Sequence, residues 1–313
     1  MPNKSIIEVG GKQLKLSNLD KIFYPSTAFT KGQVIDYYIR IAPVLLPHLK
    51  GRPLTLKRYP NGALQKFFYQ KECPSSKPDW LQTAPIWSES NQKNTNFCLV
   101  EDLPSLIWSA NLAALELHTS LSLAQTILQP TMVVFDLDPG PPAAILQCAR
   151  VSLWLRQLLS AHSLQAFPKT SGSKGLQVYL PLNTPADYDQ TKTFARKIAL
   201  LLEQSYPEYV VSNMRKSLRT GKVFVDWSQN DDHKTTVCVY SLRARELPTV
   251  STPVSWQEVE AALAKRDPDL LVFNAQQVLE RVAADDDLFA PVLTVRQKLP
   301  KPETLAAIAK NVH

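Results

Sequence analysis

The sequence predicts a mixed α+β fold, and three observations support this prediction. Apolar or alternating runs of strand length occur along the chain, most clearly at 131–136, 176–181 and 222–227. Longer stretches with apolar residues at helical spacing lie between them, at about 142–161 and 188–206. Some strand-like runs follow one another without a helix, which excludes the strict alternation of a parallel α/β protein.

The first 120 residues mix short strands and helices. Thr30 is a candidate N-cap for a helix whose apolar positions recur at helical spacing. These positions are Val34, Ile35, Tyr38, Ile41 and Ala42. Residues 52–59 and 65–69 are expected to be strands joined by the turn Pro-Asn-Gly. Residues 88–96 are polar without a packing pattern, which predicts a loop.

The second half contains the remaining expected elements. The predicted strands are 131–136, 164–168, 176–181, 208–212, 222–227 and 236–240, and the predicted helices are 142–161, 188–206, 255–264 and 274–284. Residues 291–313, rich in Lys and Pro before an Ala-rich stretch, are expected to form a tail or linker.

Composition is that of an ordinary globular protein, with 313 residues, 44% hydrophobic and 20% charged. No apolar run of 18 residues and no signal peptide is visible, so a soluble protein without a membrane partner is expected. A net charge of +7 permits a polyanionic partner. The four cysteines match no zinc-binding spacing, which favours buried free thiols in a reducing cytoplasm.

Two carboxylates follow the most apolar of these strands. Asp136 and Asp138 end the run Met-Val-Val-Phe-Asp-Leu-Asp, just before Pro-Gly. Side chains two residues apart on a strand lie on the same face, so both carboxylates can bind one cation. Oxygen ligands of this kind suit Mg²⁺ or Mn²⁺. The same spacing recurs in polar surroundings, typical of solvated charges, at Asp187 and Asp189, Asp267 and Asp269, and Asp285 and Asp287.

Two other segments carry groups that suit a phosphate substrate. The loop 169–175, Lys-Thr-Ser-Gly-Ser-Lys-Gly, offers hydroxyl, backbone N–H and ammonium donors, although a solvated hairpin turn would have the same composition. Asp226 ends another strand and, placed beside the first two carboxylates, would complete a site for two metal ions. Basic residues are frequent in the region that follows, and Arg243 is the best candidate among them for a bidentate phosphate contact. They are Arg215, Lys216, Arg219, Lys222, Lys234, Arg243 and Arg245.

The order of these motifs resembles the polymerase domain of bacterial DNA ligase D, in the archaeo-eukaryotic primase superfamily. The likeness includes Val-Phe-Asp-Leu-Asp-Pro-Gly, Lys-Thr-Ser-Gly-Ser-Lys-Gly-Leu, Lys-Val-Phe-Val-Asp-Trp-Ser-Gln-Asn and Tyr-Ser-Leu-Arg-Ala-Arg. In the first half it includes Leu-Asp-Lys-Ile-Phe-Tyr-Pro and Phe-Phe-Tyr-Gln-Lys. It covers about residues 10–290 and implies an N-terminal lobe over 10–125 and a catalytic lobe over 126–290. Mixed or antiparallel sheets flanked by helices would carry the Asp triad at strand ends in a cleft.

The resemblance also implies a function. It indicates a template-directed nucleotidyltransferase that fills gaps and extends 3′ ends in non-homologous end joining, with two Mn²⁺ or Mg²⁺ ions and ribo- or deoxynucleoside triphosphates. Ribonucleotides would be preferred, and a downstream 5′-phosphate would be recognised. The implied partners are broken or gapped DNA, a Ku-type end-binding protein and a DNA ligase, in the bacterial cytoplasm at the nucleoid.

The site residues that the resemblance implies fall into three groups. The metal ligands would be Asp136, Asp138 and Asp226. The nucleotide contacts would be Ser171, Ser173, Lys174, Gln177, Arg243 and His118. The DNA contacts would be Lys21 and Lys31 at a 5′-phosphate, Phe67 and Phe68 stacked on the template, and Lys57, Arg58 and Arg219. Phe224 and Trp227 are expected to be core residues.

One position departs from the family pattern, and other functions stay open. Gln177 replaces a His that contacts the triphosphate, and a neutral amide would cost about 1–2 kcal/mol of binding. A primase that starts chains de novo is one alternative, although the matches at Lys21 and Lys31 favour gap filling. A phosphohydrolase is disfavoured because Pro139 follows the second Asp. A DNA-end-binding scaffold without catalysis is the alternative that Gln177 favours.

Overall fold

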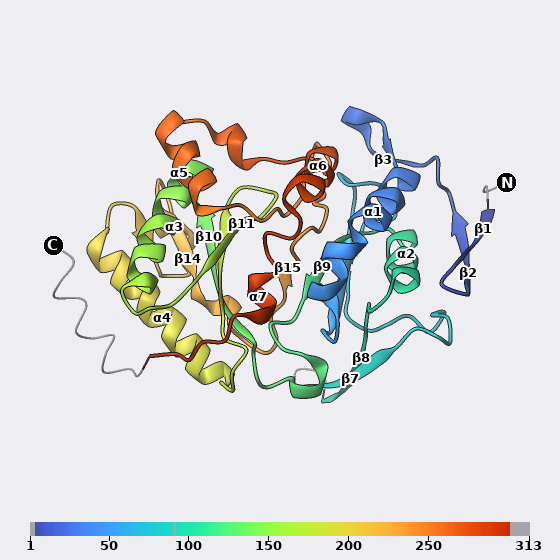
Figure 1. Cartoon of the computed structure of the whole chain (residues 1–313), viewed down its shortest axis with the longest axis horizontal. Coiled ribbons are helices and arrows are strands. Elements are labelled where there is room, and N and C mark those ends of the chain that lie inside the picture. Colours follow the sequence, from blue (N-terminus) through green and yellow to red (C-terminus); the bar gives the residue numbers. More distant parts are fainter. Residues whose placement is uncertain (1–3, 90–91, 301–313) are drawn as a thin grey trace. The chain divides into compact units, whose positions relative to one another are not determined.

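The computed structural model describes residues 4–89 and 92–300, and these residues belong to two compact units (Figure 1). The first unit contains the chain up to Gln125 together with Thr235–Ser251 and Phe273–Asp287. The second contains Thr126–Lys234, Thr252–Val272 and the chain from Leu288. The chain therefore crosses between the units repeatedly, which differs from the expected catalytic lobe over a continuous 126–290. Of the two late segments, Thr235–Ser251 contributes a strand to the sheet of the first unit.

The first unit is built on a six-stranded sheet in the order β15-β9-β5-β8-β7, with β6 also paired to β5. Two small antiparallel pairs, β1-β2 and β3-β4, precede it. The elements are β1 (Lys4–Val9), β2 (Lys12–Ser17), β3 (Ile22–Tyr24), β4 (Phe29–Thr30), α1 (Lys31–Leu49), β5 (Leu54–Arg58), β6 (Phe68–Gln70), β7 (Thr83–Ser88), β8 (Lys93–Cys98), α2 (Leu103–Asn111), β9 (Ala114–Thr119), β15 (Thr236–Val237) and α6 (Ala275–Asp285).

Helix α1 begins where the sequence predicted. The Thr30 side chain accepts a hydrogen bond from the backbone N–H of Gln33, whose own side chain bonds back to the Thr30 N–H. Val34, Tyr38 and the other apolar positions of the predicted face are buried. The cap and the apolar face therefore give both the start and the packing of this helix.

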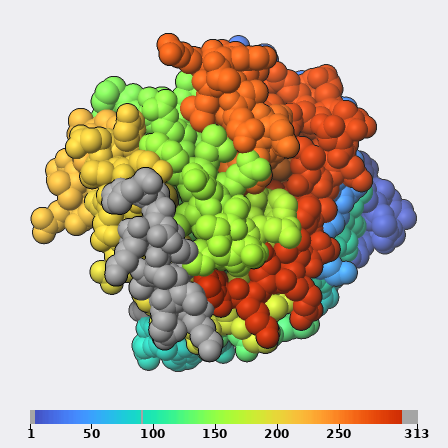
Figure 2. All heavy atoms as spheres, turned by 60° about the vertical axis from the view of Figure 1, so that its left-hand side comes forward, coloured from blue at the N-terminus to red at the C-terminus, as the bar shows by residue number. Residues whose placement is uncertain are grey.

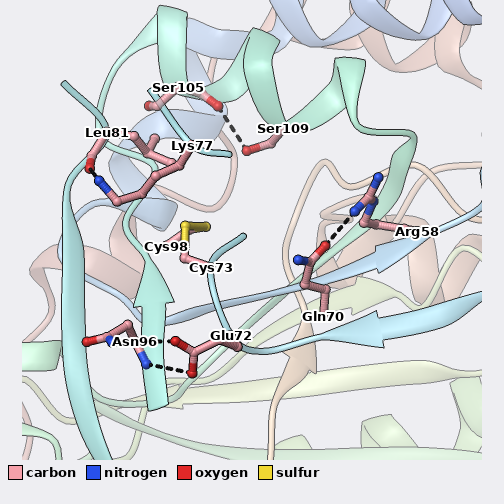
Figure 3. The surroundings of a disulfide bond; sticks show 10 residues. All are labelled: Arg58, Gln70, Glu72, Cys73, Lys77, Leu81, Asn96, Cys98, Ser105 and Ser109. Atoms are coloured by element: carbon pink, nitrogen blue, oxygen red, sulfur yellow. Dashed lines mark hydrogen bonds between the residues drawn. A yellow bond between two sulfur atoms is a disulfide. The ribbon is translucent and has the colours of Figure 1, made fainter. Parts of the chain in front are cut away.

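Two predictions for the first unit were wrong. Within the expected loop 88–96, Ser88 and residues 93–96 instead belong to β7 and β8, which pair as an antiparallel hairpin. Cys73 and Cys98 are not free thiols but form a disulfide (Figure 3). The Cys73 N–H donates to the Asn96 carbonyl oxygen at 2.7 Å, which holds the segment after β6 beside β8 and brings the sulfurs together. Cys148 and Cys238 are buried and free, as predicted.

The second unit carries a five-stranded sheet in the order β11-β12-β10-β14-β13. Neighbouring strands are antiparallel except β13 and β14, which are parallel. The elements are β10 (Met132–Pro139), α3 (Ile145–Ser160), β11 (Phe167–Thr170), β12 (Leu176–Pro181), α4 (Tyr188–Ser205), β13 (Val210–Val211), β14 (Val223–Asp226), α5 (Trp256–Lys265) and α7 (Pro291–Thr294).

Helices α3 and α4 pack on one face of this sheet (Figure 1). The ring of Phe135 on β10 meets Phe194 on α4, and the Cys148 thiol of α3 donates to the Leu137 carbonyl oxygen. Because side chains alternate along a strand, Asp136 and Asp138 lie on the opposite face. Helix α5 packs against α3, and the space-filling view shows its orange segment beside the green residues of this unit (Figure 2).

Residues 291–297, which were expected to belong to a tail or linker, pack on the second unit instead. Val292 in α7 is buried, and the Gln297 side chain bonds to backbone atoms of Gln165 and Pro181. These contacts tie residues 291–297 to the second unit, and residues 301–313 lie outside the described part of the chain. Within the described residues, no helix is long and apolar enough to cross a membrane.

Candidate active site

The three predicted metal ligands lie together at the ends of two adjacent strands. Asp136 on β10 pairs in register with Asp226 on β14, and Asp138 lies two residues further along β10 on the same face. Asp136 and Asp226 are half-buried, whereas Asp138 is exposed. The Asp226 carboxylate is oriented by hydrogen bonds from the Ser228 N–H at 2.9 Å and the Ser228 hydroxyl at 2.6 Å. The sheet order thus assembles the triad that the sequence could only propose.

Burial and like charge act together on Asp136. Burial, together with the nearby carboxylates of Asp138 and Asp226, raises the pKa of this carboxyl from 3.8 to about 7. A hydrogen bond from Gln177 and the charge of Lys169 lower the pKa but do not cancel the increase. The donor atoms are all carboxylate oxygens, and bound divalent cations would relieve their repulsion. The residues therefore fit Mg²⁺ or Mn²⁺.

Gln177 and Lys169 are aligned with Asp136 across neighbouring strands of the sheet. Lys169 on β11 pairs with Gln177 on β12, which pairs with Asp136 on β10. The fully buried Lys169 ammonium donates to the Gln177 Oε1 atom at 2.6 Å, and the Gln177 amide bonds Asp136. Gln177 is thus engaged on both sides within the sheet, so its contact with a triphosphate stays a prediction.

The loop between β11 and β12 lies against the end of β10. A Cβ atom added at Gly175 would overlap the Leu137 carbonyl oxygen, so only glycine allows this approach. Within the loop, the Ser171 Oγ atom accepts from the backbone N–H groups of Ser173 and Gly175, each at 3.2 Å. Lys174 is exposed. The approach at Gly175 therefore positions two hydroxyls and an ammonium next to the strand that carries Asp136 and Asp138.

Arg219 lies beside the end of β10 in the second unit. Its guanidinium stacks 3.7 Å from the centre of the Phe224 ring, and its Nη2 atom donates to the Met214 carbonyl oxygen at 2.8 Å. A Cβ atom added at Gly140 would overlap the Arg219 carbonyl oxygen, so this glycine lets the two segments meet. Phe224 is buried, as predicted, and Trp227 is half-buried.

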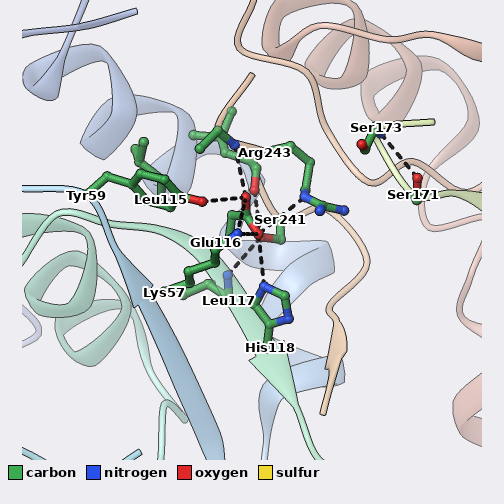
Figure 4. Close-up of polar contacts among 12 residues, drawn as sticks. Lys57, Tyr59, Leu115, Glu116, Leu117, His118, Ser171, Ser173, Ser241 and Arg243 are labelled. Carbon is green, nitrogen blue, oxygen red and sulfur yellow. Dashed lines mark hydrogen bonds and ion pairs between the residues drawn. The ribbon is translucent and has the colours of Figure 1, made fainter. Parts of the chain in front are cut away.

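The remaining predicted nucleotide contacts belong to the first unit. Arg243 and His118 both contact Glu116, a buried carboxylate on β9 that the sequence analysis missed (Figure 4). Arg215, Lys216, Arg219, Lys222 and Lys234 belong to the second unit, so the predicted basic cluster is divided between the two units.

Lys21 and Lys31 are brought together by the turn that precedes α1. The Lys31 N–H donates to the Lys21 carbonyl oxygen at 2.8 Å. The Lys31 ammonium is buried and donates to the Ser17 carbonyl oxygen at 2.6 Å and to the Asn111 Oδ1 atom at 2.8 Å. Burial, together with the positive charges of Lys21 and Arg58, lowers the pKa of Lys31 to about 8. These three cations therefore influence one another, as in a site for a phosphate anion.

The predicted stacking residues are exposed. Phe67 and Phe68 expose 49% and 44% of their surface. Phe68 lies against the Arg58 guanidinium at 5.0 Å, and Phe67 lies against the Lys57 ammonium at 4.3 Å. An exposed aromatic ring with an adjacent cation suits a stacked base and its phosphate.

Sequence reasoning missed Glu116 and Lys169. Glu116 stands in the run Ala-Leu-Glu-Leu-His, where a carboxylate two residues before His118 on a strand would have signalled a shared face. The sequence predicts Lys169 in the loop 169–175, although the apolar residues before it also allow the strand to continue. Both are buried charged residues. A charged residue within an apolar strand indicates that the folded protein provides a group that pairs with its charge.

Comparisons with known proteins show what this chain is similar to. A family model described as "LigD, primase-polymerase domain" matches residues 30–289. The chain is 41% identical over 283 residues to the multifunctional non-homologous end joining protein LigD of Mycolicibacterium smegmatis, covering 90% of this chain and 36% of that protein. It is 33% identical over 273 residues to the bifunctional non-homologous end joining protein LigD of Bacillus subtilis, covering 86% of this chain and 42% of that protein.

A solved structure matches over nearly its full length. The polymerase domain from Mycobacterium tuberculosis ligase D in complex with DNA superposes with a TM-score of 0.82 and 39% identity. The match covers 91% of this chain and 99% of that one. The predicted fold class is therefore confirmed. The chain spans 36% to 42% of the length of these two curated relatives.

Proposed function

Because this chain belongs to the LigD primase-polymerase domain family, a family of nucleotidyltransferases, we propose that it extends primer 3′ ends on a DNA template and fills gaps at broken ends. The observation that carries this proposal is the register pair of Asp136 and Asp226, with Asp138 on the same face and the donor-rich loop beside them. Non-homologous end joining is the proposed repair pathway, because the curated relatives bear that name.

In this proposal, the three aspartates of the second unit provide the catalytic centre for phosphoryl transfer. Asp136, Asp138 and Asp226 would hold two divalent ions, Mn²⁺ or Mg²⁺, which when bound neutralise triphosphate charge and favour ionisation of the primer 3′-hydroxyl. The 3′-oxygen forms a bond to the α-phosphorus while the bond to the pyrophosphate oxygen breaks. Asp226, oriented by Ser228, assists loss of the hydroxyl proton. The Ser171 and Ser173 hydroxyls and the Lys174 ammonium bind the triphosphate.

The first unit supplies further contacts in this proposal. Arg243 binds the triphosphate and His118 contacts the nucleotide. Lys57 and Arg58 stand beside the exposed rings of Phe67 and Phe68, where a template strand would stack.

Lys21 and Lys31 bind the 5′-phosphate of the downstream strand. Their adjacency and the lowered pKa of Lys31 support this assignment, because an anion would compensate the clustered positive charge. Preference for ribonucleotides over deoxynucleotides is part of the same proposal. A Ku-type end-binding protein and a DNA ligase are the proposed partners in joining.

Extension of a labelled primer across a short gap tests this function. Gaps with and without a downstream 5′-phosphate are compared with ribo- and deoxynucleotides, in Mn²⁺ and in Mg²⁺. We expect extension that improves with the 5′-phosphate and is lost in Asp138→Ala. Glu208→Gln, at an exposed carboxylate of the same unit, is the matched control and should behave as wild type. Tight DNA binding without extension by wild type would instead indicate an end-binding scaffold.

A further inference from the structure

Glu116 is a buried carboxylate at the centre of the polar contacts in the first unit (Figure 4). Its side chain is 2% exposed, in the middle of β9. A buried charge of this kind is costly unless it is fully paired. The groups that contact the Glu116 carboxylate therefore determine its charge and its role.

Donors surround both carboxylate oxygens. The Oε1 atom accepts from the Tyr59 hydroxyl at 3.1 Å and from the Ala244 N–H at 3.2 Å. The Oε2 atom lies 3.0 Å from His118 Nε2, 3.4 Å from Arg243 Nε and 3.4 Å from Lys57 Nζ. Burial alone would raise the pKa of Glu116, but the hydrogen bond from His118 and the positive charges of Arg243 and Lys57 outweigh it and hold the pKa well below its usual range. Glu116 is thus ionised and accepts only.

The ionised carboxylate determines the protonation of the His118 ring. An acceptor at 3.0 Å requires the Nε2 atom to carry the proton. Burial lowers the pKa of His118, which favours the neutral ring. In a neutral imidazole with hydrogen on Nε2, the Nδ1 atom has a lone pair and no hydrogen. His118 therefore offers an acceptor and not a donor.

We propose that Glu116 is a positioning residue for nucleotide binding, which fixes His118 in the tautomer protonated at Nε2 and holds the Nε edge of Arg243. This inference rests on the proposed function for the nucleotide contacts of His118 and Arg243. Its consequence concerns the substrate. A lone pair at Nδ1 accepts from a sugar hydroxyl, whereas a phosphate oxygen that is itself an acceptor would be repelled. Among the groups that all nucleoside triphosphates share, only the sugar hydroxyls are donors, so the structure assigns His118 to the sugar of the nucleotide.

The tautomer is tested without turnover. Long-range ¹H–¹⁵N spectra of protein labelled at its five histidines distinguish protonation at Nε2 from protonation at Nδ1, and His118→Gln identifies the signal. Wild type should show hydrogen on Nε2. In Glu116→Gln an amide N–H₂ can donate to the ring, so a shift toward hydrogen on Nδ1 is expected. Glu203→Gln makes the same change at a carboxylate that accepts from Ser212, and should leave the His118 signal unchanged.

Nucleotide binding tests the consequence. Glu116→Gln should weaken binding of ATP about tenfold and raise its KM accordingly, with a much smaller change in kcat, because a hydrogen bond to the sugar is lost. Binding of 2′,3′-dideoxy-ATP, which lacks both hydroxyls, should change less than twofold. Glu116→Asp keeps the charge and should keep the Nε2 tautomer, so it provides the test if the Gln variant does not fold.

Two results would overturn the inference. One is an unchanged His118 signal in Glu116→Gln, and the other is equal weakening of ATP and dideoxy-ATP. If wild type extends no primer, the proposed function fails, but the spectra and the binding measurements still decide the role of Glu116.

Discussion

The structure predicts that removing the charge of Asp136 stabilises the metal-free protein. Burial, with the added repulsion of Asp138 and Asp226, raises the pKa of Asp136 from 3.8 to about 7. A difference of about three pH units corresponds to about 4 kcal/mol that the ionised folded state loses relative to the unfolded chain. Asp136→Asn removes that cost and keeps the size of the side chain.

The pH dependence follows from the direction of the shift. Between about pH 4 and pH 7 the folded state binds more protons than the unfolded state, so the free energy of unfolding falls as pH rises through this range. Asp136→Asn does not lose stability in this way as pH rises. The two proteins should therefore be similar near pH 4, and the variant should be more stable by roughly 2–4 kcal/mol at pH 8.

Urea denaturation in EDTA at pH 4.5, 6 and 8 measures this difference. We expect the midpoint of Asp136→Asn at pH 8 to exceed that of wild type by about 1 M. Added Mn²⁺ should stabilise wild type more than the variant, because it binds the folded carboxylates. Glu208→Gln should match wild type throughout. A variant that is less stable than wild type in EDTA at pH 8 would refute the reasoning.

Three further predictions concern other parts of the molecule. Gly175→Ala should raise the nucleotide KM at least tenfold without unfolding the protein, because the added Cβ overlaps the Leu137 carbonyl oxygen and displaces the loop. Steady-state kinetics measures this KM, and an unchanged value would contradict the prediction. Lys31→Met should abolish the stimulation of gap filling by a downstream 5′-phosphate. In wild type this stimulation should decline as pH rises through about 8, where Lys31 loses its proton, and a constant stimulation up to pH 10 would argue against the assignment. Cys73→Ser should lower the free energy of unfolding by about 3 kcal/mol, since the disulfide to Cys98 closes a 25-residue loop. Dithiothreitol should lower the melting temperature of wild type alone. Equal melting temperatures of wild type and variant without dithiothreitol would exclude this contribution.

The sequence determined the features that depend on nearby residues. The Thr30 cap, the apolar face of α1 and the strand that ends at Asp136 and Asp138 are local patterns of periodicity and capping. The helices and strands of the second half could be predicted for the same reason. The motif order was sufficient to indicate the family, because several spaced motifs constrain one another.

Tertiary structure decided what depends on strand order. Only the sheet places Gln177, Asp136 and Asp226 in one row and joins Lys169 to its end, since these residues are distant in sequence and pair through backbone ladders. The Glu116 contacts join residues from separate strands in the same way.

The errors have the same origin. The first four residues of β8, Lys-Asn-Thr-Asn, are polar, so the sequence shows no apolar pattern that would indicate a strand there. The disulfide joins cysteines whose 25-residue spacing carries no signal of contact. A sequence records each residue's neighbours along the chain, whereas burial, charge pairing and cross-strand contact depend on neighbours in space. For this reason the chemistry of the carboxylate pair was visible from the sequence, but the residues that position it were not.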